Sequence, residues 1–374
     1  MQRLRFMIWM LYCLCRLCLQ ADCLVPFTDS PARKCRIPAT VSSVNDAVKA
    51  EDTPLKVKAA DLLISTMFKF GPLKQFVTEK ARNDMVKRGL GIDVDWVNDI
   101  KYLDDNFEKL QRSYDEIMDR RIEYPEYYQK PFHAYEDGNL CWQAAKEVEC
   151  AALTVHAPIF TPSREILDKN GDSILRGNFH RNMLEMLHQR GDNYVSSIKR
   201  VVDIGCSTGL STIKCFESFP QAEIIGIDLS PHMLSVAKFQ LETQTSLESA
   251  RKSIKYMHAA AEKVDIGVKD IDLVTMCLVS HELPTRTARD IFDEAYHMLK
   301  PGGAFSLMDM DPNSIFFQKF AGNPIAFAAF KSTEPWIQEY VSMDLEKTLA
   351  SCGFIDIQVK SNSPRHRTVV AYKD

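Results

Sequence analysis

The sequence predicts an α/β fold in which a mainly helical N-terminal region precedes a Rossmann-like, doubly wound sheet of seven strands ending in an antiparallel hairpin. Three observations predict it. Short apolar runs alternate with helical patterns from residue 197 to residue 374, as in a parallel sheet with crossover helices. Glycines stand where the first strand meets the first helix. Residues 50–196 show mainly helical spacing.

The composition indicates an ordinary soluble globular protein. Of 374 residues, 45% are hydrophobic and 26% are charged, and the net charge is −4. This balance shows no basic surplus, so we expect no nucleic-acid partner. The six cysteines beyond residue 35 include no C-x-x-C pair, so we expect buried thiols and no metal site.

Residues 1–45 are predicted to be a targeting presequence. Arg3 and Arg5 precede an apolar run at 6–15 that is too short to span a bilayer, and residues 26–40 are rich in basic and hydroxyl side chains. This order resembles the bipartite presequences of plastid proteins in algae with secondary plastids. We therefore expect a plastid (chloroplast) location and no stable membrane insertion of the mature protein. The alternatives are a simple organellar transit peptide, the secretory pathway and a short membrane anchor.

The helical region, residues 50–196, begins with apolar residues at helical spacing over 62–86, interrupted by Gly71-Pro72. A heptad pattern follows from Trp96 to Ile117. It predicts one long helix packed within the molecule. A coiled coil that forms a homodimer is the alternative.

An aromatic segment, residues 123–142, is interrupted by prolines and a glycine. One interpretation is a hydrophobic cluster that holds the helices together. The other is a lid over a pocket for a planar or apolar acceptor, in which His133 and Tyr135 face the substrate.

The C-terminal half, residues 197–374, supplies the sheet. Helices are expected between the strands, and Pro301-Gly302-Gly303 and Gly353 mark two helix ends. The Ser/Asn/Pro-rich stretch at 361–364 separates the two strands of the closing hairpin. The strands are predicted at 200–204, 223–227, 254–258, 271–278, 304–308, 355–359 and 368–372.

The turn after the first strand predicts a ligand site. Gly205 permits a sharp turn and a close approach of a ligand to the main chain, and Gly209 lets a helix begin against the sheet. Asp228, at the end of the second strand, is placed to accept hydrogen bonds from two ribose hydroxyls. A dinucleotide site would need a glycine where Ser207 stands, and Asp203 would repel a pyrophosphate. An NAD(P)-dependent oxidoreductase is therefore the weaker alternative.

The runs VVDIGCSTG, IIGIDLS and LKPGG, with the terminal hairpin after GF, resemble class I S-adenosylmethionine-dependent methyltransferases over nearly all of residues 200–374. The resemblance implies a seven-stranded methyltransferase sheet and S-adenosyl-L-methionine as cofactor. It places the methionine end near the first turn, the ribose at Asp228 and the adenine beside Leu229 and either Ala260 or Ala261. The expected cofactor-binding residues are Asp203, Gly205, Cys206, Ser207, Gly209, Asp228, Leu229, Ala260, Ala261 and Leu278.

A narrower resemblance is carried by YPEYYQKPFHAYEDGNLCWQAA, SHELP and KSTEPW. These stretches look like a group of plastid-associated methyltransferases from plants and algae. This narrower resemblance does not identify the methyl acceptor.

The end of the fourth strand supplies the candidate catalytic residues His281 and Glu282. His281 has an intrinsic pKa suited to a general base and is also a candidate substrate contact, with Glu282 as its orienting partner or as a second base. The alternative is that His281 is a hydrogen-bonded turn residue and that Glu282 caps the next helix.

Two further segments are expected to be structural. Asp309 and Asp311 could bind a metal or a cationic acceptor, but a solvated turn with a capping Asp is favoured. Residues 332–335 are expected to begin a helix.

The sequence therefore predicts an enzyme of methyl transfer that acts on a small, apolar or aromatic molecule by in-line displacement. A non-catalytic S-adenosylmethionine-binding scaffold is the alternative from another class. A scaffold would have no need for the full set of Asp203, Gly205, Gly209 and Asp228.

Overall fold

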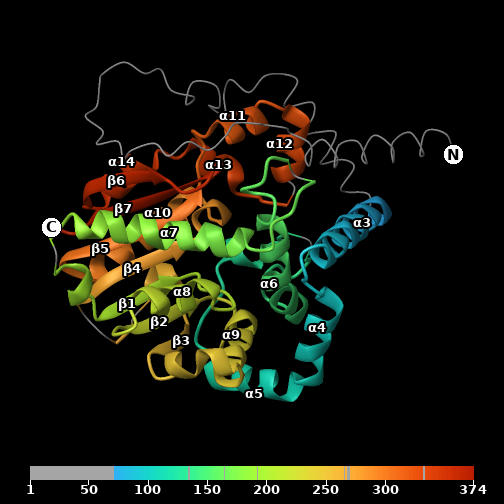
Figure 1. Cartoon of the computed structure of the whole chain (residues 1–374), viewed down its shortest axis with the longest axis horizontal. Helices are drawn as coiled ribbons and strands as arrows, with labels where there is room; N and C mark the ends of the chain where they lie inside the picture. The colour runs from blue at the N-terminus through green and yellow to red at the C-terminus, as the bar shows by residue number, and fades with distance from the viewer. Residues whose placement is uncertain are drawn as a thin grey trace.

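The computed structural model describes residues 71–374, apart from 134, 164, 192, 265, 268, 269 and 332. The predicted presequence and the start of the helical pattern lie outside the described residues. Figure 1 shows a sheet covered by helices, with the first helices of the described chain at one end of it.

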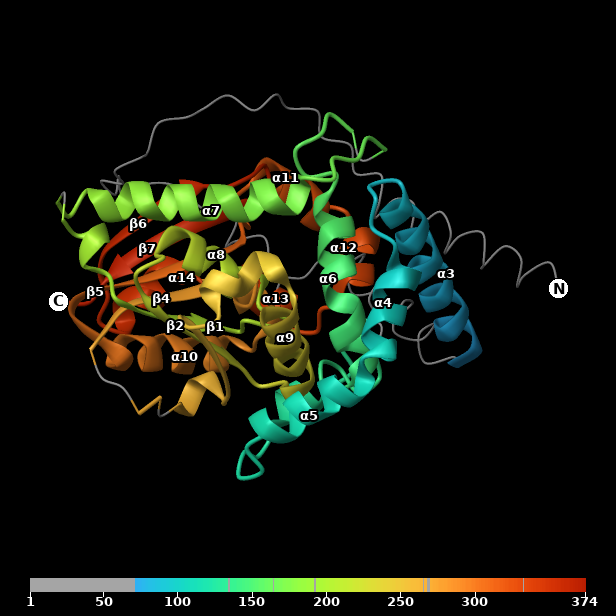
Figure 2. The ribbon, with the colours of Figure 1, turned by 60° about the horizontal axis from the view of Figure 1, so that its bottom comes forward.

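These four helices form a cap, which comprises α3 (Gly71–Leu90), α4 (Trp96–Asp105), α5 (Phe107–Ile117) and α6 (Trp142–His156). The prediction of one long helix across the heptad pattern is wrong, because the helix is interrupted at Asn106, which separates α4 from α5. The seam still packs inside the molecule, since Leu103 and Leu110 are buried against α6 and α9 (Pro231–Thr243). Figure 2 shows the cap beside the sheet rather than over its faces.

The seven predicted strands form one sheet in the order β3-β2-β1-β4-β5-β7-β6. Strands β1 to β5 run parallel, and β7 pairs antiparallel with both β5 and β6. The prediction of a Rossmann-like sheet with an antiparallel hairpin is confirmed. The strands are β1 (Arg200–Ile204), β2 (Glu223–Asp228), β3 (Ile254–His258), β4 (Ile271–Cys277), β5 (Leu299–Met310), β6 (Ile355–Ser361) and β7 (His366–Tyr372).

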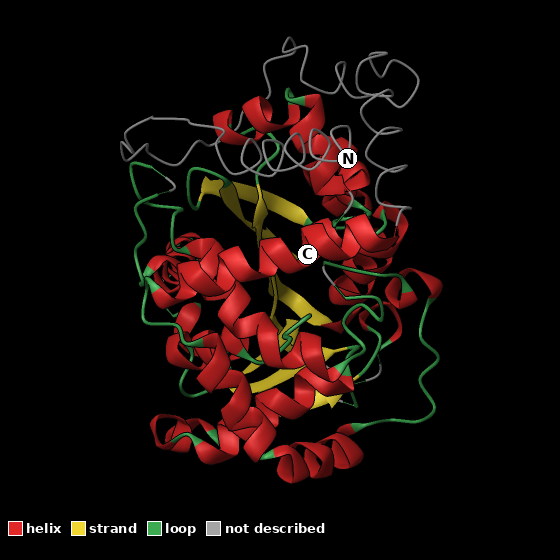
Figure 3. Cartoon of the chain, turned by 90° about the vertical axis from the view of Figure 1, so that its right-hand side faces the viewer, coloured by secondary structure: helices red, strands yellow, loops and turns green. Residues whose placement is uncertain are grey.

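Helices cover both faces of the sheet, as period-two alternation of buried strand residues requires. Val201 points into a core with α7 (Gly171–His188) and α8 (Leu210–Ser218). Val202 points into a second core with α10 (Thr285–Met298), α13 (Ile337–Ser342) and α14 (Leu345–Ser351). Two short helices, α11 (Ile315–Ala321) and α12 (Pro324–Lys331), follow β5. Figure 3, viewed from the cap, shows helices in front of the strands.

The turn of the closing hairpin is anchored on α7. Asn178 Nδ2 donates to the carbonyl of Asn362 at 3.1 Å, and Asn362 Nδ2 donates to the carbonyl of Leu175 at 3.1 Å. Helix α7, which precedes the sheet in sequence, therefore belongs to the layer that covers it. Among the described helices, none combines the length and apolar character needed to cross a bilayer.

Candidate active site

One cavity of about 930 Å³ lies between the cap and the carboxyl ends of the parallel strands. Gly205, Asp228 and Leu278, which end or follow β1, β2 and β4, line one part of it. Open α/β sheets bind ligands at this edge, where strand order reverses between β1 and β4. The cavity therefore lies where the sequence predicts the site.

The turn after β1 is shaped by two glycines in the left-handed region. Gly205 has φ +66°, and a Cβ there would lie 2.5 Å from Val279 Cγ2. Gly209 has φ +91° and precedes α8, and a Cβ there would lie 2.3 Å from Tyr256 Oη. Neither position has room for a larger side chain. Ser207 also has a positive φ, of 49°.

Asp228 connects this turn to the next one. Its Oδ2 accepts a hydrogen bond from the Ser207 amide at 2.8 Å, and its Oδ1 accepts one from the Ser230 amide at 2.8 Å. Tyr128 Oη, from the aromatic segment, donates to Oδ1 at 3.4 Å. The carboxylate is thus fixed at the cavity wall, in the position expected for a ribose contact.

The residues predicted to bind the cofactor differ in whether they line the cavity. Seven of them line the cavity, whereas Asp203, Gly209 and Ala260 are not among its lining residues. Asp203 is fully buried and accepts hydrogen bonds from Ser211, Thr212 and Thr275 hydroxyls at 2.7 to 2.9 Å. Its carboxylate therefore stabilises the start of α8 from behind the turn, and direct contact with a ligand stays a prediction. The lining residues are Gly205, Cys206, Ser207, Asp228, Leu229, Ala261 and Leu278.

The aromatic segment forms a wall of the cavity. Tyr127, Tyr128, Phe132, His133 and Tyr135 all line it. Tyr127 Oη donates to Glu262 Oε1 at 3.1 Å, which holds the segment on the adenine side predicted from the sequence. Tyr135 Oη donates to Glu147 Oε2 at 3.0 Å, so this hydroxyl is engaged with α6, and its role toward a substrate stays a prediction.

His281 and Glu282 lie at the opposite part of the cavity. His281 Nδ1 is hydrogen-bonded to Asp309 Oδ1 at 2.7 Å, and Asp309 Oδ2 accepts from the His281 amide at 3.1 Å. The expectation of a solvated turn is wrong for Asp309, which is fully buried because β5 extends to Met310. The orienting partner of His281 is therefore Asp309, while Glu282 Oε1 lies 4.0 Å from His281 Nε2.

The charges around these two residues set their protonation. Burial alone would lower the pKa of His281, but the charge and hydrogen bond of Asp309 outweigh burial and raise it to about 10. Burial raises the pKa of Glu282 to about 7, against the opposing charges of His281 and His133. Near neutral pH His281 is thus a cation, and Glu282 is the group that can exchange a proton.

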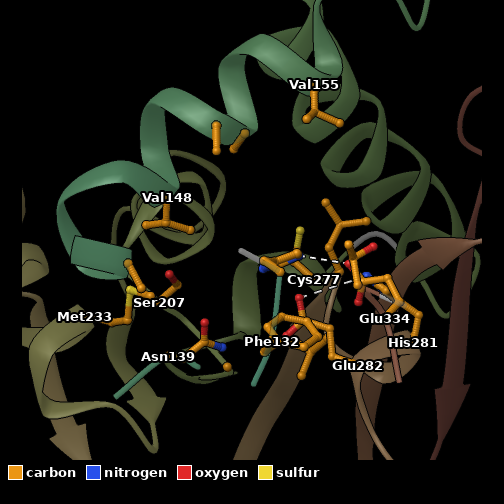
Figure 4. A pocket seen from close by; sticks show the side chains of 18 of the residues that line it. Phe132, Asn139, Val148, Val155, Ser207, Met233, Cys277, His281, Glu282 and Glu334 are labelled. Atoms are coloured by element: carbon orange, nitrogen blue, oxygen red, sulfur yellow. Dashed lines mark ion pairs between the residues drawn. The ribbon is translucent and has the colours of Figure 1, made fainter. Parts of the chain in front are cut away.

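The structure adds Glu334 to this cluster, although the sequence indicated only a helix start there. Helix α13 begins at Ile337, and Glu334 lies before it with its side chain against the cavity. Glu334 Oε1 is paired with His133 Nε2 at 2.9 Å. Figure 4 shows Phe132, His281, Glu282 and Glu334 gathered on one side, with Ser207 on the other. No local pattern signals this pairing.

Arg176 on α7 is a second residue without a sequence signal. It is 8% exposed, lines the cavity and donates through Nε to both Asp172 oxygens at 3.1 Å. Its Nη1 lies 3.4 Å from Cys277 Sγ, at the end of β4. The guanidinium is therefore held at the cavity wall, beside the end of β4.

The sequence of the chain matches known methyltransferases. Residues 201–303 match a family model described as a methyltransferase domain. An uncharacterized methyltransferase of Synechocystis is 28% identical over 178 residues, covering 47% of this chain and 73% of that protein. A demethylmenaquinone methyltransferase of Lactococcus lactis is 31% identical over 178 residues, covering 43% and 68%. A Haemonchus contortus phosphoethanolamine N-methyltransferase, solved with S-adenosylhomocysteine, has 16% identity, 52% coverage of each chain and a TM-score of 0.40.

The chain belongs to the class I S-adenosylmethionine-dependent methyltransferases, enzymes whose cofactor is S-adenosylmethionine. The family match spans the glycine turn, Asp228, His281 and Glu282, while the cap, His133 and Glu334 lie outside it.

Proposed function

We propose that the protein transfers a methyl group from S-adenosylmethionine to a small-molecule acceptor by in-line displacement. The observation that carries the proposal is the shared cavity, which is lined at one part by Gly205 and Asp228 and at the other by His281 and Glu282. Its volume of about 930 Å³ is in the range of small-molecule sites. In-line transfer requires that donor and acceptor be aligned, and one shared cavity serves that purpose.

The residues present fit the cofactor. Gly205 leaves the main chain of the turn open to the cavity, and Asp228 offers a fixed carboxylate for hydroxyl donors. When bound, S-adenosylmethionine supplies an electrophilic methyl group on a sulfonium. Leu229 and Ala261 provide apolar surface for the adenine.

In this proposal Glu282 accepts the proton and His281 positions the acceptor. His281 is already protonated near neutral pH, so it can donate a hydrogen bond to the reacting atom but cannot take its proton. As the acceptor atom bonds to the methyl carbon, the carbon–sulfur bond breaks, and the acceptor's proton passes to the Glu282 carboxylate. The products are the methylated acceptor, the neutral thioether and a protonated Glu282.

We also propose that the protein belongs to the narrower group of plastid-associated methyltransferases. The three stretches that resemble plastid-associated methyltransferases meet in the cavity, through Tyr128 and His133, through His281 and Glu282, and through Glu334. We therefore propose plastid metabolites as acceptors and a plastid location for the protein.

A transfer assay tests the proposal. The protein is incubated with S-adenosylmethionine labelled in the methyl group and with metabolite extracts from isolated algal plastids or from the remaining cell fraction. We expect label in small molecules, and more of it with the plastid extract. Label only in precipitated protein or nucleic acid would contradict a small-molecule acceptor, and equal label from both extracts would contradict the plastid assignment.

The site also predicts a role for Arg176, as the partner of the cofactor's carboxylate. We expect Arg176→Lys to weaken S-adenosylhomocysteine binding about tenfold, because Lys keeps the charge beside Asp172 but loses the fork that pairs with a carboxylate. Binding of 5′-methylthioadenosine, which has no amino-acid group, should be unchanged. Both affinities are measured by calorimetry.

Arg181→Lys is the matched control, because Arg181 is an exposed arginine of the same helix. Equal losses for both ligands in Arg176→Lys would show a general effect on the pocket and contradict a carboxylate contact.

A further inference from the structure

Glu334 lines the cavity and carries a buried carboxylate oxygen that no described residue pairs with. The residue is 5% exposed and lies between α12 and α13. Its Oε1 is paired with His133 Nε2 at 2.9 Å, whereas its Oε2 is buried and has no hydrogen-bond partner among the described residues. A buried acceptor left unpaired costs about 1–3 kcal/mol, and more when it is charged. Because the side chain lines the cavity, a bound molecule can supply the missing donor.

The carboxylate is held in place by contacts between two distant segments. The His133 amide donates to the carbonyl of Thr333 at 3.1 Å, and Lys130 Nζ lies 4.8 Å from the centre of the Trp336 ring. His133 has φ 53°, a conformation that a residue with a side chain adopts at a cost. These contacts fix Glu334 before any ligand arrives, which reduces the entropy lost on binding.

The surroundings of Glu334 favour a flat apolar molecule. Phe132, Phe320, Phe330 and Trp336 line the same cavity and present aromatic surface. Such rings pack against planar groups in stacked or edge-to-face arrangements. Figure 4 shows Glu334 beside Glu282 and Phe132 at this part of the pocket.

The polar groups here also define which head group is tolerated. The charge of Asp309 is engaged by His281, and Oε1 of Glu334 is engaged by His133. Among the described residues at this part of the cavity, the carboxylate oxygens left for a ligand's donor are therefore those of Glu282 and Oε2 of Glu334. Both accept hydrogen bonds, and in their ionised forms both repel an anion at short range in a site of low dielectric.

We propose that Glu334 selects the methyl acceptor: its free oxygen accepts a hydrogen bond from a hydroxyl or amine on a flat apolar body, and it excludes molecules with a carboxylate or phosphate at that position. This inference rests on the proposed function, because it assigns an acceptor class to the same cavity.

Two probes that share one ring system test it, 2-naphthol and 2-naphthoate, each titrated into the full chain saturated with S-adenosylhomocysteine. We expect 2-naphthol to bind at least tenfold more tightly than 2-naphthoate. In Glu334→Gln the preference should fall to within about threefold, because the amide presents a donor to the carboxylate of naphthoate. Glu346→Gln, at an exposed position of α14, is the control and should keep the wild-type preference.

Failure of the role proposed for Glu334 can be distinguished from failure of the proposed function. Failure of S-adenosylhomocysteine to bind would contradict the function before any probe is added. With S-adenosylhomocysteine bound, equal binding of the two probes, absence of binding by either, or an unchanged preference in Glu334→Gln would overturn the role of Glu334. A thermal unfolding curve of Glu334→Gln that matches the wild type establishes that the variant is folded.

Discussion

Replacing Glu282 by Gln is expected to lower the turnover rate about 10²–10³-fold while leaving S-adenosylhomocysteine affinity unchanged. The amide has nearly the same shape but cannot take the acceptor's proton. His281 cannot substitute for it near neutral pH, because Asp309 holds the pKa of His281 at about 10. Methyl transfer to an acceptor found in the labelling assay, at saturating cofactor, is the measurement.

The pH dependence of kcat/KM shows whether Glu282→Gln has lost a general base or only a contact with the acceptor. Glu282 must be deprotonated to act, and burial raises its pKa to about 7, so kcat/KM should rise with pH through about 7 and level off above it. The charges that face Glu282 are those of His281, His133, Glu334 and Asp309. In Glu282→Gln this rise should be absent.

Glu126→Gln, at an exposed position of the aromatic segment, should keep the wild-type profile and serves as the control. If Glu282→Gln retains full turnover and the same pH limb, the acceptor reacts without this base, and the role of Glu282 is refuted.

Replacing Asp228 by Ala is expected to weaken S-adenosylmethionine binding at least about 100-fold, which corresponds to about 2.8 kcal/mol. The variant loses the predicted ribose acceptor and also the anchor of the Ser207 and Ser230 amides, each bonded at 2.8 Å. Calorimetry with S-adenosylmethionine and with S-adenosylhomocysteine measures the loss.

Asp290→Ala, on the exposed face of α10, is the control for this substitution. Thermal unfolding of Asp228→Ala monitors the fold, because loss of the Ser207 anchor also loosens the turn. Undiminished binding by a folded Asp228→Ala variant would show that the cofactor is not held at the end of β2.

Local features of the sequence were sufficient for most of the sheet. Apolar runs at strand spacing predicted all seven strands, and Gly205 and Gly209 predicted the turn, because a positive φ is read directly from a glycine between a strand and a helix. The heptad pattern did not predict where one helix ends. Apolar spacing continues across Asn106, but the helix is interrupted there, and Leu103 and Leu110 are buried on separate helices. The periodicity of apolar residues indicates which side of a helix is buried, but it does not change where the helix is interrupted.

The sequence by itself determined the class of fold, the cofactor turn and the presence of His281 and Glu282 at an active edge. Only the tertiary structure decided their chemistry. His133 and Glu334 are about two hundred residues apart and meet through the packing of two loops. The partner of His281, which follows β4, is Asp309 on β5. Turn and strand preferences arise from a few neighbouring residues, whereas pKa values and ligand contacts depend on which distant charges share one buried space.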